Sequence, residues 1–107
     1  MNPSVLAASI SNALTQLDTI LASGVPDFGT PQWQQLFAMR KHLDDQQRSL
    51  LQQTIQADDA TFAGAADDVK TATTDLTGAI KAGATIDSII NIVAQVSSAV
   101  GAVLKLA

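Results

Sequence analysis

The sequence predicts an all-α protein folded as a four-helix up-down bundle, and three observations favour this fold class. Of its 107 residues, 47% are hydrophobic and 15% are charged, which is typical of a chain that buries a single core, so residues 1–107 should form one domain. Apolar residues recur three and four positions apart, which is the spacing of one helical face. Capping and helix-breaking residues divide this pattern into segments at about 4–23, 31–56, 59–82 and 86–105.

The first segment is expected to begin near Pro3 or Ser4. Its apolar positions follow the helical spacing and are Leu6, Ile10, Ala13, Leu14, Leu17, Ile20 and Leu21. Ser23-Gly24 has the chemistry of a helix C-cap, and Pro26 prevents the helix from resuming. The first helix should therefore end near residue 23.

The start of the second segment is better marked than its end. Thr30-Pro31 combines an N-cap residue with proline at the first helical position. No glycine or proline lies between positions 32 and 61, so the break before the third helix depends on Asp58 or Asp59 acting as an N-cap. If the second and third helices were instead continuous, one helix of about 50 residues and 75 Å would give a three-helix or dimeric arrangement.

The last two segments are expected to form an antiparallel hairpin. Lys81 and Gly83 combine a last-turn cation with a C-cap glycine. Thr85 is a suitable N-cap for the final helix. The connection between the two helices is so short that they must lie side by side in opposite directions.

The segment 86–105 has a broad apolar face, covering about 160° of the helix where a surface helix usually shows a little over 100°. We therefore expect it to be the central and most buried helix, with part of the excess width left for a partner near Ile92, Val96 and Val103. Polar residues interrupt this face too often for a membrane-spanning helix.

Composition excludes several classes of function. A net charge of −4 argues against nucleic acid as a partner, because phosphate binding needs clustered Lys and Arg. The chain has no cysteine, so neither a disulfide framework nor a thiolate metal site is possible, and we expect no cofactor. The N-terminus lacks the basic and apolar regions of a secretory signal, so cytoplasmic residence is the default expectation, with signal-independent export left open.

The second segment carries a polar row inside its apolar face. Arg40, Gln47 and Thr54 are spaced seven apart, and Asp44 and Arg48 follow Arg40 at successive intervals of four. We interpret this row as an ion-pair ladder at the edge of the core, with the Arg40 stem over apolar side chains and its head in water. The alternative is a polar interface or a binding pocket.

The remaining candidates are interpreted as structural. His42 projects away from the apolar face, and a single exposed histidine does not make a metal site. Adjacent aspartates diverge by about 100° on a helix and cannot chelate as a pair. Trp33 and Phe37 are expected to pack in the core or to clamp the loop that precedes them, with an exposed recognition patch as the alternative.

No catalytic motif is present, so we expect a non-enzymatic helical module that acts by protein–protein interaction or self-association. Its partner would be another protein or a second copy of the chain. The alternative is a membrane-active protein that uses the C-terminal helical hairpin, although the apolar face lacks the flanking basic residues of interfacial helices. A small-ligand-binding bundle built on Arg40, Asp44 and Gln47 is the third hypothesis.

Overall fold

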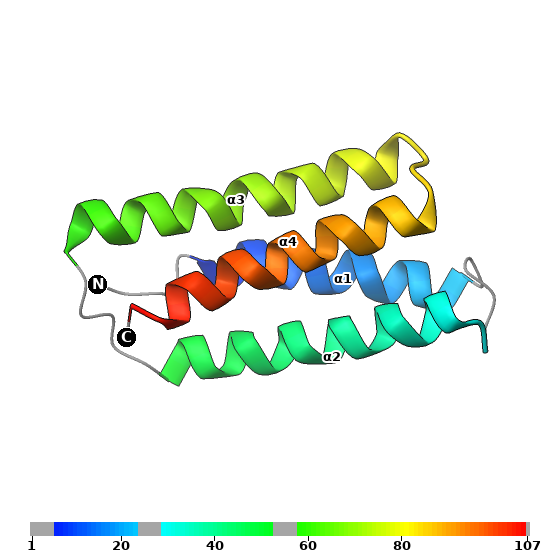
Figure 1. The fold of residues 1–107 in the computed structure, drawn as a ribbon, viewed down its shortest axis with the longest axis horizontal. Helices are drawn as coiled ribbons and strands as arrows, with labels where there is room; N and C mark the ends of the chain where they lie inside the picture. The colour runs from blue at the N-terminus through cyan, green and yellow to red at the C-terminus, as the bar shows by residue number, and fades with distance from the viewer. Residues whose placement is uncertain (1–5, 24–28, 53–57, 107) are drawn as a thin grey trace.

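The computed structural model describes residues 6–23, 29–52 and 58–106, and these residues form four helices and no strand (Figure 1). The helices are α1 (Ala7–Ser23), α2 (Pro31–Gln52), α3 (Asp59–Lys81) and α4 (Ile86–Leu104). They lie along the 43 Å axis of the molecule, and each runs opposite to the one before it in sequence (Figure 1). The prediction of an all-α, four-helix up-down bundle is confirmed.

The helices form a ring in the order α1, α2, α4, α3. The packed pairs among the described residues are α1 with α2, α2 with α4, α4 with α3, and α3 with α1. The chain passes between diagonal positions when it goes from α2 to α3, so the pairs α2–α4 and α1–α3 are parallel (Figure 1). The expectation that the last helix is central is therefore wrong, because α4 occupies one corner of the ring and lies diagonal to α1. The expectation that it is the most buried helix is confirmed, since six of its 19 residues are buried.

The core is largely aliphatic, with Phe62 of α3 as its buried aromatic side chain, and it is built from one face of each helix. Leu36, Leu43 and Leu50 of α2 repeat every seven residues, and all three have 0% exposure. The other fully buried large side chains are Leu6, Ile10 and Leu17 at the first helix, Val69 and Leu76 of α3, and Val93, Val96, Val100 and Val103 of α4. This spacing of three and four is the periodicity from which the helices were predicted.

The expectation that Val96 and Val103 lie at a partner surface is corrected. Both side chains have 0% exposure, whereas Ile92 is half-buried against the core. A corner helix must face two neighbours at once, and α4 packs against α2 on one side and α3 on the other. Its broad apolar face therefore serves two intramolecular contacts.

Local capping chemistry sets most of the described helix boundaries. The Asp58 carboxylate accepts a hydrogen bond from the Thr61 N–H at 2.7 Å. The backbone of Asp58 is extended (φ −66°, ψ 166°), so the helical conformation is interrupted immediately before α3. This excludes one continuous helix through the second and third segments. The Thr85 hydroxyl caps α4 through the Ser88 N–H at 3.3 Å, and Gly83 follows α3 with a φ of 72° that favours glycine.

Three boundary predictions fall outside the described residues. These are the start of the first helix at Ser4, its C-cap at Gly24, and the extension of the second helix beyond Gln52. Thr30 is described, and its hydroxyl accepts a hydrogen bond from the Trp33 N–H at 3.2 Å, which confirms it as the N-cap of α2.

A matched pair of leucine truncations on α2 tests the core. Leu43 is fully buried whereas Leu51 is 52% exposed. We expect Leu43→Ala to lower the free energy of unfolding by about 2–5 kcal/mol, because it removes buried methyl groups and leaves a cavity. Leu51→Ala should change it by no more than about 0.5 kcal/mol. Urea denaturation of both variants checks this, and equal losses would contradict the placement of the two faces.

The Asp58 cap predicts an acid-sensitive contribution to stability. The hydrogen bond from the Thr61 backbone N–H lowers the pKa of the Asp58 carboxyl below its ordinary value. Because the pKa of this carboxyl is lower in the folded state than in the unfolded state, its ionised form stabilises the fold at pH values above the ordinary pKa. This stabilisation is lost as the pH falls through the lowered, folded-state pKa. We expect Asp58→Asn, which keeps a capping oxygen, to flatten the fall in Tm over the acid limb, whereas Asp58→Ala should lower Tm at neutral pH. An unchanged acid limb in Asp58→Asn would contradict this assignment.

Candidate functional site

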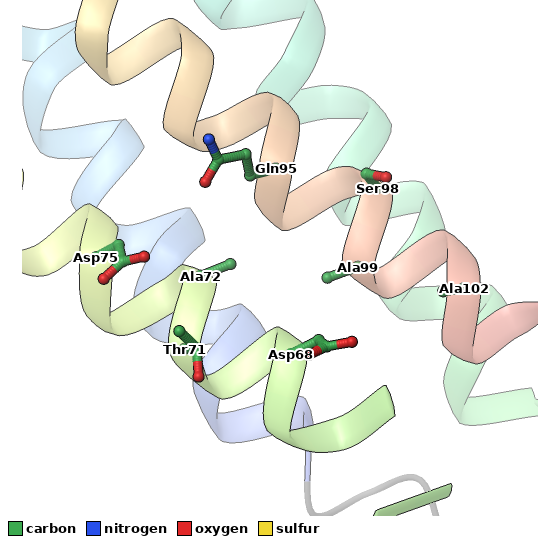
Figure 2. A pocket seen from close by; sticks show the side chains of 8 residues that line it. All are labelled: Asp68, Thr71, Ala72, Asp75, Gln95, Ser98, Ala99 and Ala102. Atoms are coloured by element: carbon green, nitrogen blue, oxygen red, sulfur yellow. The ribbon is translucent and has the colours of Figure 1, made fainter. Parts of the chain in front are cut away.

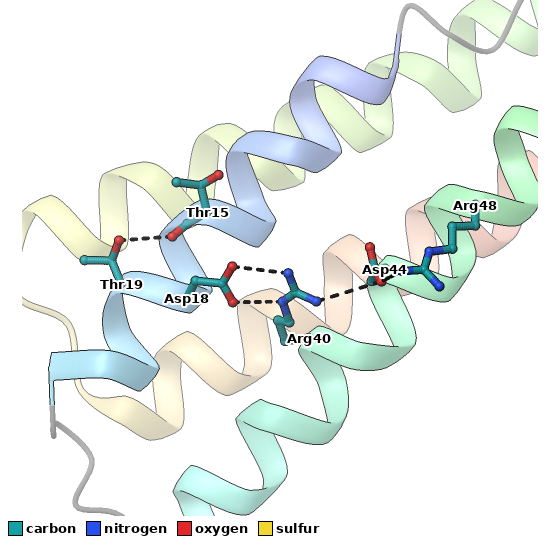
Figure 3. A network of polar contacts seen from close by, with 6 residues as sticks. All are labelled: Thr15, Asp18, Thr19, Arg40, Asp44 and Arg48. Carbon is teal, nitrogen blue, oxygen red and sulfur yellow. Dashed lines mark hydrogen bonds and ion pairs between the residues drawn. The ribbon is translucent and has the colours of Figure 1, made fainter.

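The polar row predicted on the second helix lies at the contact between α1 and α2. The Arg40 Nε donates to Asp18 Oδ1 at 2.8 Å and its Nη2 to Asp18 Oδ2 at 3.2 Å, which is a bidentate pair between the two helices (Figure 3). Arg40 Nη1 lies 3.9 Å from Asp44 Oδ2, and Arg48 Nη2 lies 3.0 Å from the same oxygen. The ion-pair ladder is therefore confirmed, and Asp18 is an additional member that the sequence did not identify.

Burial and pairing explain how Arg40 sits at the edge of the core. Its side chain is 29% exposed, so the stem is covered and the head reaches the surface. The hydrogen bond to Asp18 raises the pKa of the Arg40 guanidinium further above its already high value. The residue thus stays charged and serves as a clamp between α1 and α2.

Gln47 makes a second contact from α2 to α1. Its Nε2 donates to the Ala7 carbonyl at 3.1 Å and to the Ser11 hydroxyl at 2.8 Å. Thr54, the third member of the polar row, lies outside the described residues. Arg40 and Gln47 therefore use their donors to hold α1 against α2.

A reciprocal polar pair joins α2 to α4. Gln46 Nε2 donates to the Ser97 carbonyl at 3.1 Å, and the Ser97 hydroxyl donates to Gln46 Oε1 at 2.9 Å. Gln46 is buried, and its amide nitrogen lies beside Gly101, one turn beyond Ser97, where a Cβ atom would be in ordinary contact at 3.6 Å. This pair could not be predicted from the sequence, because a glutamine beside an apolar stripe gives no signal of a partner 51 residues away.

The pair α1–α3 also has a polar contact, but it is incomplete. Gln16 Nε2 donates to the Thr77 hydroxyl at 2.8 Å, while the buried Gln16 Oε1 has no hydrogen-bond partner. Among the described residues, no side-chain hydrogen bond joins α3 to α4. That contact depends on the packing of small and apolar side chains.

An open groove runs along the outer side of the α3–α4 contact (Figure 2). It has a volume of about 390 Å³. Small side chains make its floor, and Ala72 of α3 and Ala99 of α4 lie between the two helices (Figure 2). Asp68 and Asp75 line the α3 side, whereas the α4 side carries the neutral Gln95. The groove therefore has one acidic wall and one neutral wall.

The outer face of α2 carries the two large hydrophobic side chains that are most exposed in the described part of the chain, Phe37 at 50% and Leu51 at 52%. Trp33 stacks on Phe37, with ring centroids 5.4 Å apart and planes 11° apart. The Trp33 indole also donates to the Leu21 carbonyl at 3.0 Å, so it clamps the end of α1. The clamp was predicted for the loop before α2, most of which lies outside the described residues.

His42 is exposed, as predicted. It lines a cavity of about 350 Å³ between α2 and α4, together with Met39 and Ala94 among others. No group of three or more histidine, cysteine, aspartate or glutamate side chains in the described ranges is placed to hold a metal ion. The polar side chains of Arg40, Gln46 and Gln47 are engaged in contacts between helices of the bundle.

Comparisons of the chain with protein-family profiles, with curated proteins and with solved structures find no match.

The Gln46–Ser97 pair predicts a non-additive pair of substitutions. Ser97→Ala removes the donor to Gln46 Oε1 and should lower the free energy of unfolding by about 1–3 kcal/mol, because a buried acceptor is left unpaired. Adding Gln46→Leu removes that acceptor, so the double variant should be more stable than the sum of the two single losses by at least about 0.5 kcal/mol. The control is Ser98→Ala at the neighbouring exposed position. Strict additivity in urea denaturation would contradict the contact.

Proposed function

We propose that this protein is a non-enzymatic helical module that acts by contact with other protein surfaces, including those of further copies of itself. The observation that carries the proposal is the exposed aromatic position on α2. Phe37 is half exposed and is held flat against Trp33, which itself is fixed to α1. A rigid aromatic side chain on a helix surface is the type of residue that anchors protein interfaces.

The use of polar groups supports the same proposal. Arg40, Gln46 and Gln47 donate to neighbouring helices, so they contribute to the fold. The ligand-binding hypothesis required Arg40, Asp44 and Gln47 to face a common cavity, and their partners are instead Asp18, Arg48 and α1. Outside the core, the structure offers shallow grooves and exposed apolar positions, which suit a protein partner.

The membrane alternative depends on α4. Among the described helices, α4 alone is long and apolar enough to cross a membrane by length and composition, with a mean hydropathy of 1.5. The core helix of a water-soluble bundle meets the same criteria. In the present structure the valines of α4 are buried inside the four-helix bundle. Membrane insertion would require the bundle to open and Gln46–Ser97 to separate, which disfavours it.

The proposal predicts association that depends on Phe37. We expect the natural protein to form oligomers in a sedimentation-velocity concentration series, or to retain a defined protein partner on an affinity column. Phe37→Ser should weaken that association by about tenfold or more, because it removes an aromatic anchor. Ser49→Ala, at another exposed position of α2, is the control.

A strictly monomeric protein that retains no partner would contradict the proposal. Flotation with vesicles of phosphatidylcholine or phosphatidylglycerol would contradict it in a different way, since it would favour the membrane alternative.

A further inference from the structure

The outer face of α2 carries an exposed ridge, which we define as Phe37, Lys41, Arg48 and Leu51. All four side chains are exposed, and Arg48 is 72% exposed. They are spaced by four, seven and three residues, so they lie within about 80° of the helix circumference. The ridge therefore presents two cations between two large apolar side chains, and Asp44, which lies within the same arc, is paired with Arg48.

The acidic wall of the α3–α4 groove repeats this spacing. Asp68 and Asp75 line the groove, and Gly64 and Gly78 lie about one turn beyond them on α3, outside the groove lining. The four residues are also spaced by four, seven and three, and all four are exposed. A Cβ atom built on either glycine would meet nothing within 4 Å, so both ends of the wall are open. The wall thus offers two carboxylates between two open, side-chain-free positions.

We infer that the α3–α4 groove is the docking site for the α2 ridge of a second copy of this chain. With the docked α2 parallel to α3, Lys41 faces Asp68, Arg48 faces Asp75, and Phe37 and Leu51 lie over Gly64 and Gly78. This inference rests on the proposed function and names the partner surface for it.

Helix geometry makes the match simultaneous at all four positions. Seven residues advance a helix by about 10.5 Å, so the two cations of the ridge and the two carboxylates of the wall have the same separation. The order of the spacings, four then seven then three, is met only when the two helices run in the same direction. Antiparallel docking would place Phe37 and Leu51 out of register with the glycines.

Charge favours the contact on both sides. Asp44 lies 3.0 Å from Arg48 and 3.9 Å from Arg40, so Arg48 shares its charge with a carboxylate of its own helix. The exposed Lys41, which makes no ion pair with a described residue and has Asp45 four residues along the helix, is the free cation of the ridge. On α3, Lys70 does not neutralise the acidic wall, because it lines a different cavity between α1 and α3. Complementary charge of this kind sets the register and accelerates association.

The two apolar side chains at the ends of the ridge, Phe37 and Leu51, are exposed and available for contact. Phe37 is already held by its stack on Trp33, so little additional side-chain conformational entropy would be lost on docking. Positions without a side chain let a neighbouring helix approach closely, and the floor residues Ala72 and Ala99 leave the groove shallow and open (Figure 2).

The two surfaces lie on opposite faces of the bundle. The ridge flanks the Arg40–Asp18 contact between α1 and α2, and the ring order places α1 and α2 opposite α3 and α4. One contact therefore leaves a free groove on one copy and a free ridge on the other. Such heterologous contacts form rings or open filaments. Because α2 and α3 of one chain are antiparallel, docking α2 parallel to the α3 of the next copy would reverse the bundle axis from each copy to the next.

Charge reversal with rescue tests the docking. We compare by sedimentation velocity the natural protein, a groove variant (Asp68→Lys with Asp75→Lys) and a ridge variant (Lys41→Glu with Arg48→Glu). Each variant alone should associate at least about tenfold more weakly, because like charges then face each other. An equimolar mixture should regain assembly, and so should the four-substitution chain, whose net charge equals that of the natural protein.

A crosslinking experiment gives a second readout that does not require charge reversal. The chain has no cysteine, so single substitutions give unique thiols. A mixture of Lys41→Cys and Asp68→Cys proteins should form a disulfide-linked pair under mild oxidation. A mixture of Lys41→Cys and Lys70→Cys proteins, with the second thiol on the α1 side of α3, should not.

The outcomes separate this inference from the proposed function. Self-association that survives both charge reversals, or that is lost in both and not regained in the mixture, overturns the ridge–groove docking and leaves the proposed function standing. A natural protein that is monomeric at every concentration overturns the docking as well. If that monomer also retains no partner protein, the proposed function fails with it. Circular dichroism of each variant verifies that the helices are retained.

Discussion

The constraint on which this structure depends is the burial of four amphipathic helices when each can touch only two neighbours. A helix at a corner of a ring must bury a face that is wide enough for two contacts. The α4 valines meet this requirement, with Val93, Val96 and Val100 fully buried between α2 and α3. The leucines of α2 and α1 complete the core, and the absence of large aromatic side chains from α4 lets the alanine-rich α3 lie close to it. Once these faces are buried, the ring order and the positions of the outer surfaces follow.

Polar contacts between helices add specificity to this aliphatic core. Apolar faces tolerate small sliding and rotation, whereas paired hydrogen bonds fix one register. The bidentate Arg40–Asp18 pair fixes α1 against α2, the Gln46–Ser97 pair fixes α2 against α4, and Gln16–Thr77 joins α1 to α3. The α3–α4 pair needs less help, because its short connection already determines the hairpin. Among the described residues, no side-chain hydrogen bond joins α3 to α4, and the outer side of this pair is an open groove.

The same distribution gives the bundle two unlike surfaces. The outer face of α2 is bulky, with basic residues between Phe37 and Leu51. The outer side of α3 carries small and acidic residues, with glycines at the positions that a partner helix would approach. Surface ion pairs alone contribute little to affinity, so the apolar ends of the ridge would supply most of the binding energy and the charges would set its register. A module of this kind would act through assembly, and its intramolecular polar network would keep the docking surfaces rigid.

The sequence by itself determined the helical class and most of the helix boundaries. It favoured four helices and left a continuous second and third helix open, an alternative that the extended backbone of Asp58 excludes. The class and the boundaries depend on interactions within about four residues, such as the Asp58 and Thr85 caps, the glycine after α3 and the period of the apolar side chains. The same range covers the Arg40–Asp44–Arg48 ladder and the exposure of His42. Only the tertiary structure decided the ring order, the choice of Asp18 as the partner of Arg40, the pairing of Gln46 with Ser97 and the burial of Val96 and Val103. These depend on contacts between residues 22 to 51 positions apart, or on which two helices flank α4. A helical period shows that a face must be buried, but the identity of its neighbours is set by the packing of all four faces at once.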